Sequence, residues 1–276
     1  MSTLITPNLY GIIGYPLGHT LSPLIHNTAF KELGIPAVYV AWPTKPEQLA
    51  TLVDAVRLLN IRGLSVTIPH KTNLIPLMDR VTDRVKALGA ANTVYWDGEA
   101  LCADNTDIMG FLSPLQKEPL PADSKVLILG AGGAARAAAA GLKMLGLKDI
   151  AVTDIVEDLP AKLAADFDLK VVPWAERAGI QATLIVNTTP LGMKGKFEGD
   201  TGYPAEAFAG RSGIAYDVVY TPFLTRFQKE AAAAGWKTIP GREMFVMQAD
   251  HQFHTWTGHH LPEVAKRAVF DALNAA

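Results

Sequence analysis

The sequence has little that would point to a secreted, disulfide-stabilised protein. Of its 276 residues only one, Cys102, is a cysteine, so no disulfide can form within the chain. This composition suits a reducing compartment. Residues 1–7 also lack the basic region and the apolar run of a signal peptide. We therefore expect a cytoplasmic protein.

Charge and long apolar runs are equally scarce. The 25 Lys and Arg residues nearly balance the 27 Asp and Glu residues, and the net charge of −2 provides no field that would attract nucleic acid or anionic lipid. No apolar run approaches the roughly 20 residues of a membrane span. We expect a soluble protein that binds neither nucleic acid nor membranes.

The chain does have ample apolar residues, at 49%, and a length about twice that of a typical domain. In its first part, short β-branched runs at residues 9–13, 37–42 and 63–68 predict strands. Residues 46–59 carry apolar side chains at helical spacing and predict an amphipathic helix between two of these strands. Alternation of this kind predicts an α/β fold with a mostly parallel sheet.

A second α/β series follows a proline-rich stretch at residues 113–121, which ends a helix that begins near Asn105. A helix is expected at 134–145 and a shorter one after the second strand of the series. The expected strands are 125–129, 149–153, 183–187 and 214–218.

Two further helical stretches, at 243–257 and 262–275, finish the chain, and we expect them to return to the first domain. The predicted organisation is therefore two domains. Residues 1–108 with 241–276 form a substrate and catalytic domain, and residues 109–240 form a Rossmann-like dinucleotide-binding domain.

A glycine-rich turn follows the first strand of the second series. Gly130-Ala131-Gly132-Gly133-Ala134 lies between that strand and an alanine-rich helix, which is the setting of a dinucleotide-binding turn. Gly132 would let the backbone approach a pyrophosphate, and the helix N-terminus would supply N–H groups. A strand–helix turn without a ligand remains the alternative.

The cofactor prediction depends on Asp154, at the end of the next strand. An acidic residue there accepts hydrogen bonds from an adenosine ribose and repels a 2′-phosphate. Glu157 and Asp158 add negative charge, and no Lys or Arg occurs before Lys162. We expect NAD to be favoured over NADP, with a helix cap at Asp154 as the alternative.

Three polar clusters in the first half could hold a small polyhydroxylated molecule. They are Thr20 with Ser22, Thr67 with Lys71, and Asn92 with the acidic segment 104–107. Each has a plainer interpretation, because polar residues at strand ends also serve as helix caps and turns, and a lysine there can be merely solvated.

Four of the seven histidines fall within ten residues: His251, His254, His259 and His260. A metal-dependent enzyme is one interpretation, but acidic ligands at a matching spacing are absent. The alternative is a polar helix end, and we expect no metal.

The order of these motifs resembles the shikimate dehydrogenase family, which includes quinate/shikimate and aminoshikimate dehydrogenases, across essentially the whole chain. The matching segments are His19-Thr20-Leu21-Ser22-Pro23, Val66-Thr67-Ile68-Pro69-His70-Lys71, Gly89-Ala90-Ala91-Asn92-Thr93, Asp104-Asn105-Thr106-Asp107, the Gly130–Arg136 turn, Asn187-Thr188-Thr189-Pro190-Leu191-Gly192-Met193, Asp217-Val218-Val219-Tyr220-Thr221-Pro222 and Gln248-Ala249.

The resemblance implies an NAD(P)-dependent oxidoreductase that reversibly oxidises a ring hydroxyl of shikimate, or of a close analogue, to the 3-dehydro ketone. It implies Lys71 and Asp107 as the catalytic acid–base pair. The implied substrate residues are Thr20, Ser22, Thr67, Asn92, Tyr220 and Gln248. The implied cofactor residues are Gly130, Ala131, Gly132, Gly133, Ala134, Asp154, Val218, Gly241 and Asp83. We expect a monomer or a homodimer.

Several positions depart from the family pattern. Thr20 and Ser65 stand where the family commonly has Ser and Asn, and Asp154-Ile155-Val156 replaces an Asn-Arg-Thr segment that suits a 2′-phosphate. These changes favour a quinate/shikimate-type or specialised paralogue and leave the substrate open. A non-catalytic nucleotide-sensing protein is a further alternative, against which Lys71 and Asp107 argue.

Overall fold

The computed structural model describes residues 7–18, 20–118 and 120–275. Residues 1–6, which entered the signal-peptide argument, lie outside this range. So do His19 of the first family motif and Pro119 of the proline-rich stretch.

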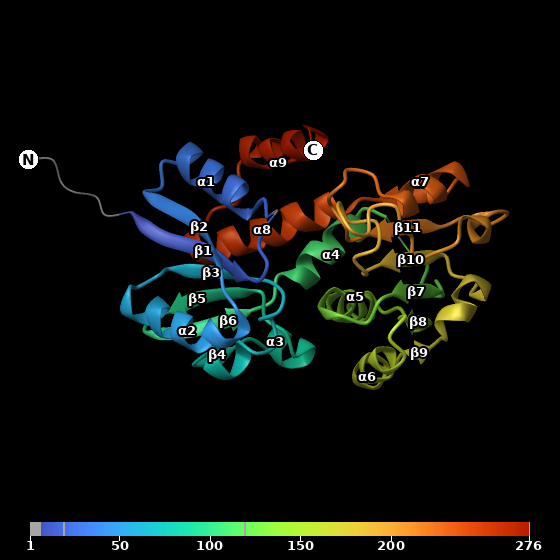
Figure 1. Cartoon of the computed structure of the whole chain (residues 1–276), viewed down its shortest axis with the longest axis horizontal. Coiled ribbons are helices and arrows are strands. Elements are labelled where there is room, and N and C mark those ends of the chain that lie inside the picture. Colours follow the sequence, from blue (N-terminus) through green and yellow to red (C-terminus); the bar gives the residue numbers. More distant parts are fainter. Residues whose placement is uncertain (1–6, 19, 119, 276) are drawn as a thin grey trace, which may run out of the picture. The chain divides into compact units, whose positions relative to one another are not determined.

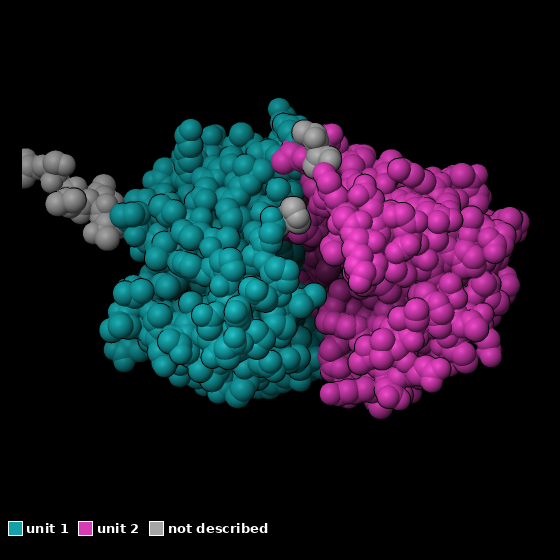
Figure 2. Space-filling view, in the orientation of Figure 1, with its two compact units in different colours: residues 1–106, 248–271 teal, residues 107–247, 272–276 magenta. Residues whose placement is uncertain are grey.

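The chain divides into two compact units, coloured separately in Figure 2. Unit 1 comprises residues 1–106 and 248–271, and unit 2 comprises residues 107–247 and 272–276. The chain returns from unit 2 to unit 1 between Met247 and Gln248, which lie inside one helix, α8 (Gly241–Thr257). The functional label of each unit stays a prediction.

Unit 1 is built on a six-stranded sheet with the order β2-β1-β3-β5-β6-β4 (Figure 1). Helix α9 (Glu263–Ala275) follows α8 and ends the chain. The remaining elements, in chain order, are β1 (Asn8–Gly14), α1 (Ser22–Glu32), β2 (Ala37–Pro43), η1 (Pro46–Gln48), α2 (Leu49–Leu58), β3 (Gly63–Val66), η2 (Ile75–Leu77), β4 (Arg80–Val81), α3 (Asp83–Leu88), β5 (Thr93–Asp97) and β6 (Ala100–Asp104).

The sheet of unit 1 is mostly parallel, as predicted for this part of the chain, except that β5 runs against the other strands. Strand β4 pairs in parallel with β6. Strand β1 pairs in parallel with β2 and β3, but β5 pairs antiparallel with both β3 and β6. Strands β5 and β6 form a hairpin with Asp97 opposite Ala100, so that only Gly98 and Glu99 lie in the turn. This hairpin is not among the elements predicted from the sequence.

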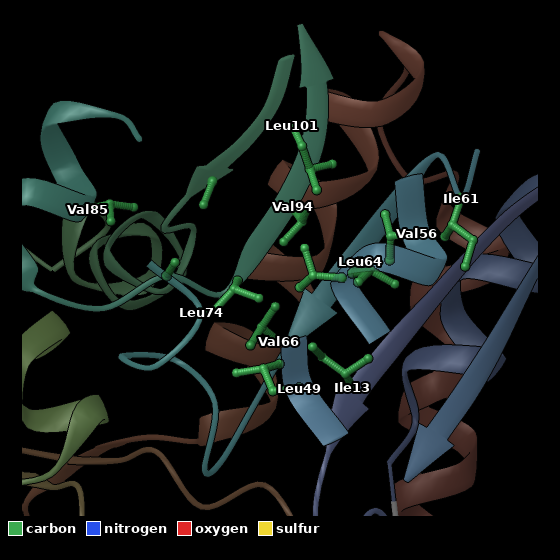
Figure 3. Packing of buried hydrophobic residues seen from close by; sticks show 13 residues of the cluster. Ile13, Leu49, Val56, Ile61, Leu64, Val66, Leu74, Val85, Val94 and Leu101 are labelled. Carbon is green, nitrogen blue, oxygen red and sulfur yellow. The ribbon is translucent and has the colours of Figure 1, made fainter. Parts of the chain in front are cut away.

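One face of this sheet is covered by α2 through an aliphatic core (Figure 3). The strands contribute Ile13, Leu64 and Val66, and α2 contributes Val53 and Val56, all at most 4% exposed. Burial of each such side chain is worth about 1.5–3 kcal/mol. This packing fixes β1 and β3 side by side, and these two strands support the candidate site described below.

The other face carries an aromatic cluster that encloses a histidine. His26 of α1 is 0% exposed, and its ring stacks on Tyr39 at a centroid distance of 4.5 Å and on Phe253 at 6.0 Å. The ring of Trp256 lies 5.2 Å away. Neither ring nitrogen of His26 has a hydrogen-bond partner among the described residues. Burial lowers the pKa of His26 to about 3, so the imidazole is neutral in the folded protein.

Unit 2 contains an all-parallel six-stranded sheet with the order β12-β11-β10-β7-β8-β9 (Figure 1). The elements are α4 (Asp107–Gln116), β7 (Val126–Leu129), α5 (Gly133–Met144), β8 (Ile150–Thr153), α6 (Asp158–Phe167), β9 (Lys170–Val171), η3 (Trp174–Gly179), β10 (Leu184–Asn187), η4 (Ala205–Phe208), β11 (Ile214–Asp217), α7 (Arg226–Ala233) and β12 (Lys237–Ile239).

The strand order of unit 2 reverses direction between β7 and β10, because the chain moves outward from β7 to β9 and then returns to add β10 on the other side. This is the strand order of a dinucleotide-binding Rossmann sheet. The predicted α/β class and the Rossmann-like sheet are therefore confirmed. None of the helices in the described part of the chain combines the length and apolar character needed to cross a bilayer.

The buried neutral imidazole predicts acid sensitivity. Because the pKa of His26 is lower in the folded than in the unfolded chain, the unfolded state binds the additional proton, and stability falls as the pH falls from 6.5 towards 3. His26→Phe should therefore lose about 2 kcal/mol less unfolding free energy than the parent between pH 6.5 and 4.5, since one proton is worth about 1.4 kcal/mol per pH unit.

Urea denaturation at a series of pH values measures this difference. The exposed His259, changed to Gln, is the control and should follow the parent curve. Parallel curves for His26→Phe and the parent would refute the assignment.

Candidate functional site

The predicted substrate residues of unit 1 gather at one edge of its sheet. Parallel strands β1 and β3 both end at this edge, and β6 ends there too because it runs antiparallel to β5. The chain leaves β1 towards Thr20 and Ser22, and leaves β3 towards Thr67 and Lys71. Ligands of open α/β sheets bind at such carboxyl ends where the strand order switches, here between β1 and β3. We call this the carboxyl edge of unit 1.

Backbone hydrogen bonds fix Lys71 at this edge. The carbonyl oxygen of Lys71 accepts a hydrogen bond from the N–H of Ala91 at 2.7 Å, which joins it to the segment before β5. The preceding residue, His70, is buried, with its Nε2 2.7 Å from the carbonyl oxygen of Thr44. Thr67 is held by its N–H, which donates to the carbonyl of Ile13 at 2.9 Å.

Asn92 links the segment before β5 to the segment after β6. Its Oδ1 accepts the N–H of Thr106 at 2.8 Å and the hydroxyl of Thr93 at 2.7 Å, and its Nδ2 donates to the Thr106 hydroxyl at 3.0 Å. The side chain is 2% exposed. Asp107 follows Thr106 directly, is 7% exposed and begins α4. The amide of Asn92 therefore fixes the chain one residue before the predicted catalytic carboxyl.

Thr20 and Ser22 form a local pair at the start of α1. The Thr20 hydroxyl donates to Ser22 Oγ at 3.2 Å, and the Ser22 N–H donates to Thr20 Oγ1 at 3.3 Å. Ser22 is buried and Thr20 is partly exposed.

Asp104, in the same polar segment as Asp107, has a structural role. Burial raises the pKa of Asp104, but hydrogen bonds from Arg84, Thr82 and the Asn105 N–H together lower it by more. The net effect is a pKa below the usual range. Arg84 Nε donates to Asp104 Oδ1 at 3.0 Å, and the Thr82 hydroxyl donates to the same oxygen at 2.7 Å.

The two remaining substrate predictions lie on other elements. Tyr220 belongs to unit 2, where its ring packs at 4.8 Å from Phe245 and burial raises the pKa of its hydroxyl. Gln248 is the first residue of the α8 segment that belongs to unit 1.

In unit 2, the glycine-rich turn lies where β7 ends, next to the end of β10. Gly130 has φ +100°, and a Cβ at this position would lie 2.7 Å from the Thr188 hydroxyl oxygen and 3.0 Å from Thr189 Cγ2. The fold itself therefore requires glycine at 130. A Cβ at Gly132, the N-cap of α5, would have no neighbour within 4 Å. The open space above Gly132 fits the close approach of a pyrophosphate.

Two more of the predicted cofactor residues meet at this edge of unit 2. Val218 directly follows β11, and its N–H donates to the carbonyl of Asn187 at 3.0 Å. A Cβ on Gly241, the first residue of α8, would lie 2.5 Å from the Val218 carbonyl oxygen. Together with the glycine-rich turn they form the carboxyl edge of unit 2, at the switch point between β7 and β10.

The predicted residues Asp154 and Asp83 have local partners. Asp154 Oδ2 accepts the N–H of Ala131 at 2.8 Å, and its Oδ1 accepts the N–H of Val156 at 2.9 Å. Asp83 lies in unit 1 and pairs with Lys86 at 2.9 Å, which lowers the pKa of its carboxyl. Asp83 is therefore not among the residues that the unit 2 sheet brings together.

The histidine-rich segment forms a stacked pair rather than a ligand set. The rings of His254 and His260 stack at 4.6 Å, and His260 Nδ1 lies 2.7 Å from Asp250 Oδ2. Burial lowers the pKa of His251, with Asp250 opposing the shift. Within residues 7–18, 20–118 and 120–275, no group of three or more His, Cys, Asp or Glu side chains is placed to hold a metal ion.

Comparison with known proteins decides the family. Residues 12–94 match the family model for the shikimate dehydrogenase substrate binding domain. The shikimate dehydrogenase (NADP(+)) of Pelobacter propionicus is 66% identical to the chain over 276 residues, which is 100% of both proteins. The chain belongs to the shikimate dehydrogenase family. It is accordingly related to NAD(P)-dependent oxidoreductases that act on a CH–OH group.

Solved structures of the family have the same two-domain fold. Shikimate 5-dehydrogenase from Thermus thermophilus, in complex with NADP(H) and shikimate, matches with a TM-score of 0.87 and 35% identity over 96% of this chain and 100% of that one. Quinate dehydrogenase from Corynebacterium glutamicum, in complex with NAD, matches with a TM-score of 0.89 and 28% identity over 96% and 99%.

The predicted preference for NAD over NADP is wrong. The Pelobacter protein and three further relatives, 47%, 45% and 43% identical to this chain, are all named shikimate dehydrogenase (NADP(+)). Both oxygens of the Asp154 carboxylate accept hydrogen bonds from backbone N–H groups, those of Ala131 and Val156, so an acidic residue has a structural role here whichever cofactor binds. These bonds give the carboxylate a structural task between the glycine-rich turn and the next loop, which sequence spacing alone does not reveal.

Gln252 is a buried partner of the unit 1 edge that is not among the residues predicted from the sequence. Gln252 is 1% exposed, and its Nε2 donates to the Asn92 carbonyl at 2.9 Å and to the Thr93 hydroxyl at 3.1 Å. Its Oε1 accepts the hydroxyl of Ser65 at 2.7 Å. The available signal was a glutamine four residues after Gln248, on the same face of the helix.

The two glycines of the turn should respond differently to alanine. Gly132→Ala should change the unfolding free energy by less than about 1 kcal/mol, because only the N-cap preference is affected, yet raise the Kd for NADP⁺ at least about tenfold by occupying the space of the phosphates. Gly130→Ala should destabilise the fold by about 1–3 kcal/mol, because φ is positive and Thr188 is too close.

Urea unfolding and a fluorescence titration with NADP⁺ separate these effects. Unchanged NADP⁺ affinity in Gly132→Ala would remove the glycine-rich turn from the binding site.

Proposed function

We propose that this chain catalyses the NADP-dependent interconversion of shikimate and the corresponding 3-dehydro ketone. The observation that carries the proposal is the convergence of Thr20, Ser22, Thr67, Lys71 and Asn92 at one sheet edge. Hydroxyls, an amide and an amine are the groups that a small polyhydroxylated carboxylate needs for recognition. The name of the Pelobacter relative and the ligands of the Thermus structure support the choice of shikimate and NADP.

The cofactor would be held at the carboxyl edge of unit 2. The backbone of Gly130 to Ala134 and the N-terminus of α5 would receive the pyrophosphate, and Val218 and Gly241 would line the same edge. Bound there, the cofactor supplies a hydride acceptor for the carbon that bears the hydroxyl. Asp154 supports the turn through the Ala131 N–H.

Lys71 and Asp107 provide the acid–base chemistry in this proposal. The amine of Lys71 accepts the hydroxyl proton in the oxidation direction and returns it during reduction. Asp107 shares the hydrogen bond to the same hydroxyl and orients it. The assignment rests on the family resemblance and on the backbone bonds that hold Lys71 at Ala91 and Thr106 at Asn92.

A matrix of substrates and cofactors tests the proposal. Initial rates with shikimate or quinate, each with NADP⁺ or NAD⁺, should give the highest kcat/KM for shikimate with NADP⁺. A higher value for quinate would assign the chain to the quinate branch of the family. No cofactor reduction with any pair would indicate a non-catalytic nucleotide-binding protein.

The acid–base assignment has its own test. Lys71→Ala should lower kcat by at least about 100-fold while the KM for shikimate changes much less, because the lost amine transfers the hydroxyl proton in the transition state. The exposed Lys86, which pairs with Asp83, provides a control, and Lys86→Ala should retain the parent rate. A kcat within threefold of the parent in Lys71→Ala would exclude Lys71 from the chemistry.

A further inference from the structure

The carboxylate of Asp217 is buried at the end of β11 and takes no part in the chemistry proposed above. It is 0% exposed, and the groups that hold it are neutral. The Thr225 hydroxyl donates to Oδ2 at 2.5 Å, and Oδ1 accepts both Asn187 Nδ2 at 2.9 Å and the Val219 N–H at 3.0 Å. Burial raises the pKa of Asp217 to about 7, which reflects how unfavourable the charge is at this place.

Asp217 sets the orientation of the Asn187 amide. Because Nδ2 faces the carboxylate, Oδ1 of Asn187 faces the opposite way and accepts from Thr189, through its hydroxyl at 2.6 Å and its N–H at 3.2 Å. Nδ2 also donates to the Leu191 carbonyl at 3.1 Å. A reversed amide would lose these bonds, so the acceptor at 217 determines how the loop from Thr188 to Leu191 leaves β10.

This loop lies against the glycine-rich turn. The Thr188 hydroxyl and N–H both donate to the carbonyl of Leu129, at 2.7 Å and 2.8 Å, one residue before Gly130. A Cβ on Gly130 would also clash with the side chains of Thr188 and Thr189. The turn and the loop therefore follow the adjacent parallel strands β7 and β10 and are in contact.

We propose that Asp217 is a positioning residue for the cofactor: through Asn187 it holds Thr188 and Thr189 against Gly130 and thereby fixes the backbone that receives the dinucleotide. The inference rests on the proposed function, since it needs a dinucleotide at this edge. Asp217 itself does not touch the reacting atoms in this proposal.

The competing explanation is that Asp217 serves only α7. Thr225 is the N-cap of that helix, forms a capping box with Gln228, and donates its hydroxyl to the same carboxylate. A purely structural Asp217 would act through Thr225, whereas the proposed one acts through Asn187 and Thr189. Substitutions on the two sides of the carboxylate distinguish these cases.

The test uses the full chain and direct NADP⁺ binding by fluorescence titration, together with steady-state KM values. Thr189→Val removes the far end of the network from a partly exposed loop and should raise the Kd for NADP⁺ at least fivefold, with the KM for shikimate within twofold. Thr225→Val removes the α7 side and should lower Tm while the Kd stays within twofold.

Two variants of Asp217 complete the design. Asp217→Leu removes the acceptor and should weaken NADP⁺ binding at least as much as Thr189→Val. Asp217→Asn keeps an acceptor for Asn187 and should recover most of that loss. If Asp217→Leu fails to fold, Thr189→Val with Thr225→Val still decides the question.

The outcomes separate the two claims. Parent-like NADP⁺ affinity in Thr189→Val, or an equal loss in Thr189→Val and Thr225→Val, would overturn the positioning role and leave the proposed function intact. A parent chain that binds neither NADP⁺ nor NAD⁺ would overturn the proposed function and this inference with it.

Discussion

Parallel pairing of two strands across a switch point is the constraint on which both candidate sites depend. In unit 1 the pairing of β1 with β3, and in unit 2 the pairing of β7 with β10, brings the carboxyl ends of two strands together at one edge. The residues that follow these strands are far apart in the sequence but become neighbours at that edge. Aliphatic packing against α2 holds the first pair in place.

Hydrogen bonds from buried amides then refine each edge. In unit 1, Asn92 joins the chain before β5 to the chain after β6, and Gln252 of α8 holds the backbone of Asn92. In unit 2, Asn187 joins the end of β10 to the end of β11. A buried amide has a donor and an acceptor side, so its partners determine its orientation and the amide in turn fixes the loops.

Sequence pattern was sufficient for the strands that alternate with helices and for the glycine-rich turn, because those features depend on local periodicity and local turn chemistry. It was insufficient for the β5–β6 hairpin, although a glycine at the first central turn position, here Gly98, is a known hairpin signal, since the strand–helix alternation around it suggested parallel pairing. Hydrogen bonding of Asp154 to Ala131, and of Gln252 to Asn92, depends on segments that meet only in the fold. The structural role of Asp154 was therefore not visible in the sequence, where its position alone suggested a preference for NAD.

Gly130 and Gly132 are two positions apart, yet the surrounding atoms constrain them differently. The fold excludes a side chain at 130, whereas nothing within 4 Å excludes one at 132. A descendant of this chain that had ceased to bind a dinucleotide would still need Gly130 in order to fold, but would be free to lose Gly132. The identity of residue 132 therefore carries a record of cofactor use, whereas the identity of residue 130 records only the architecture.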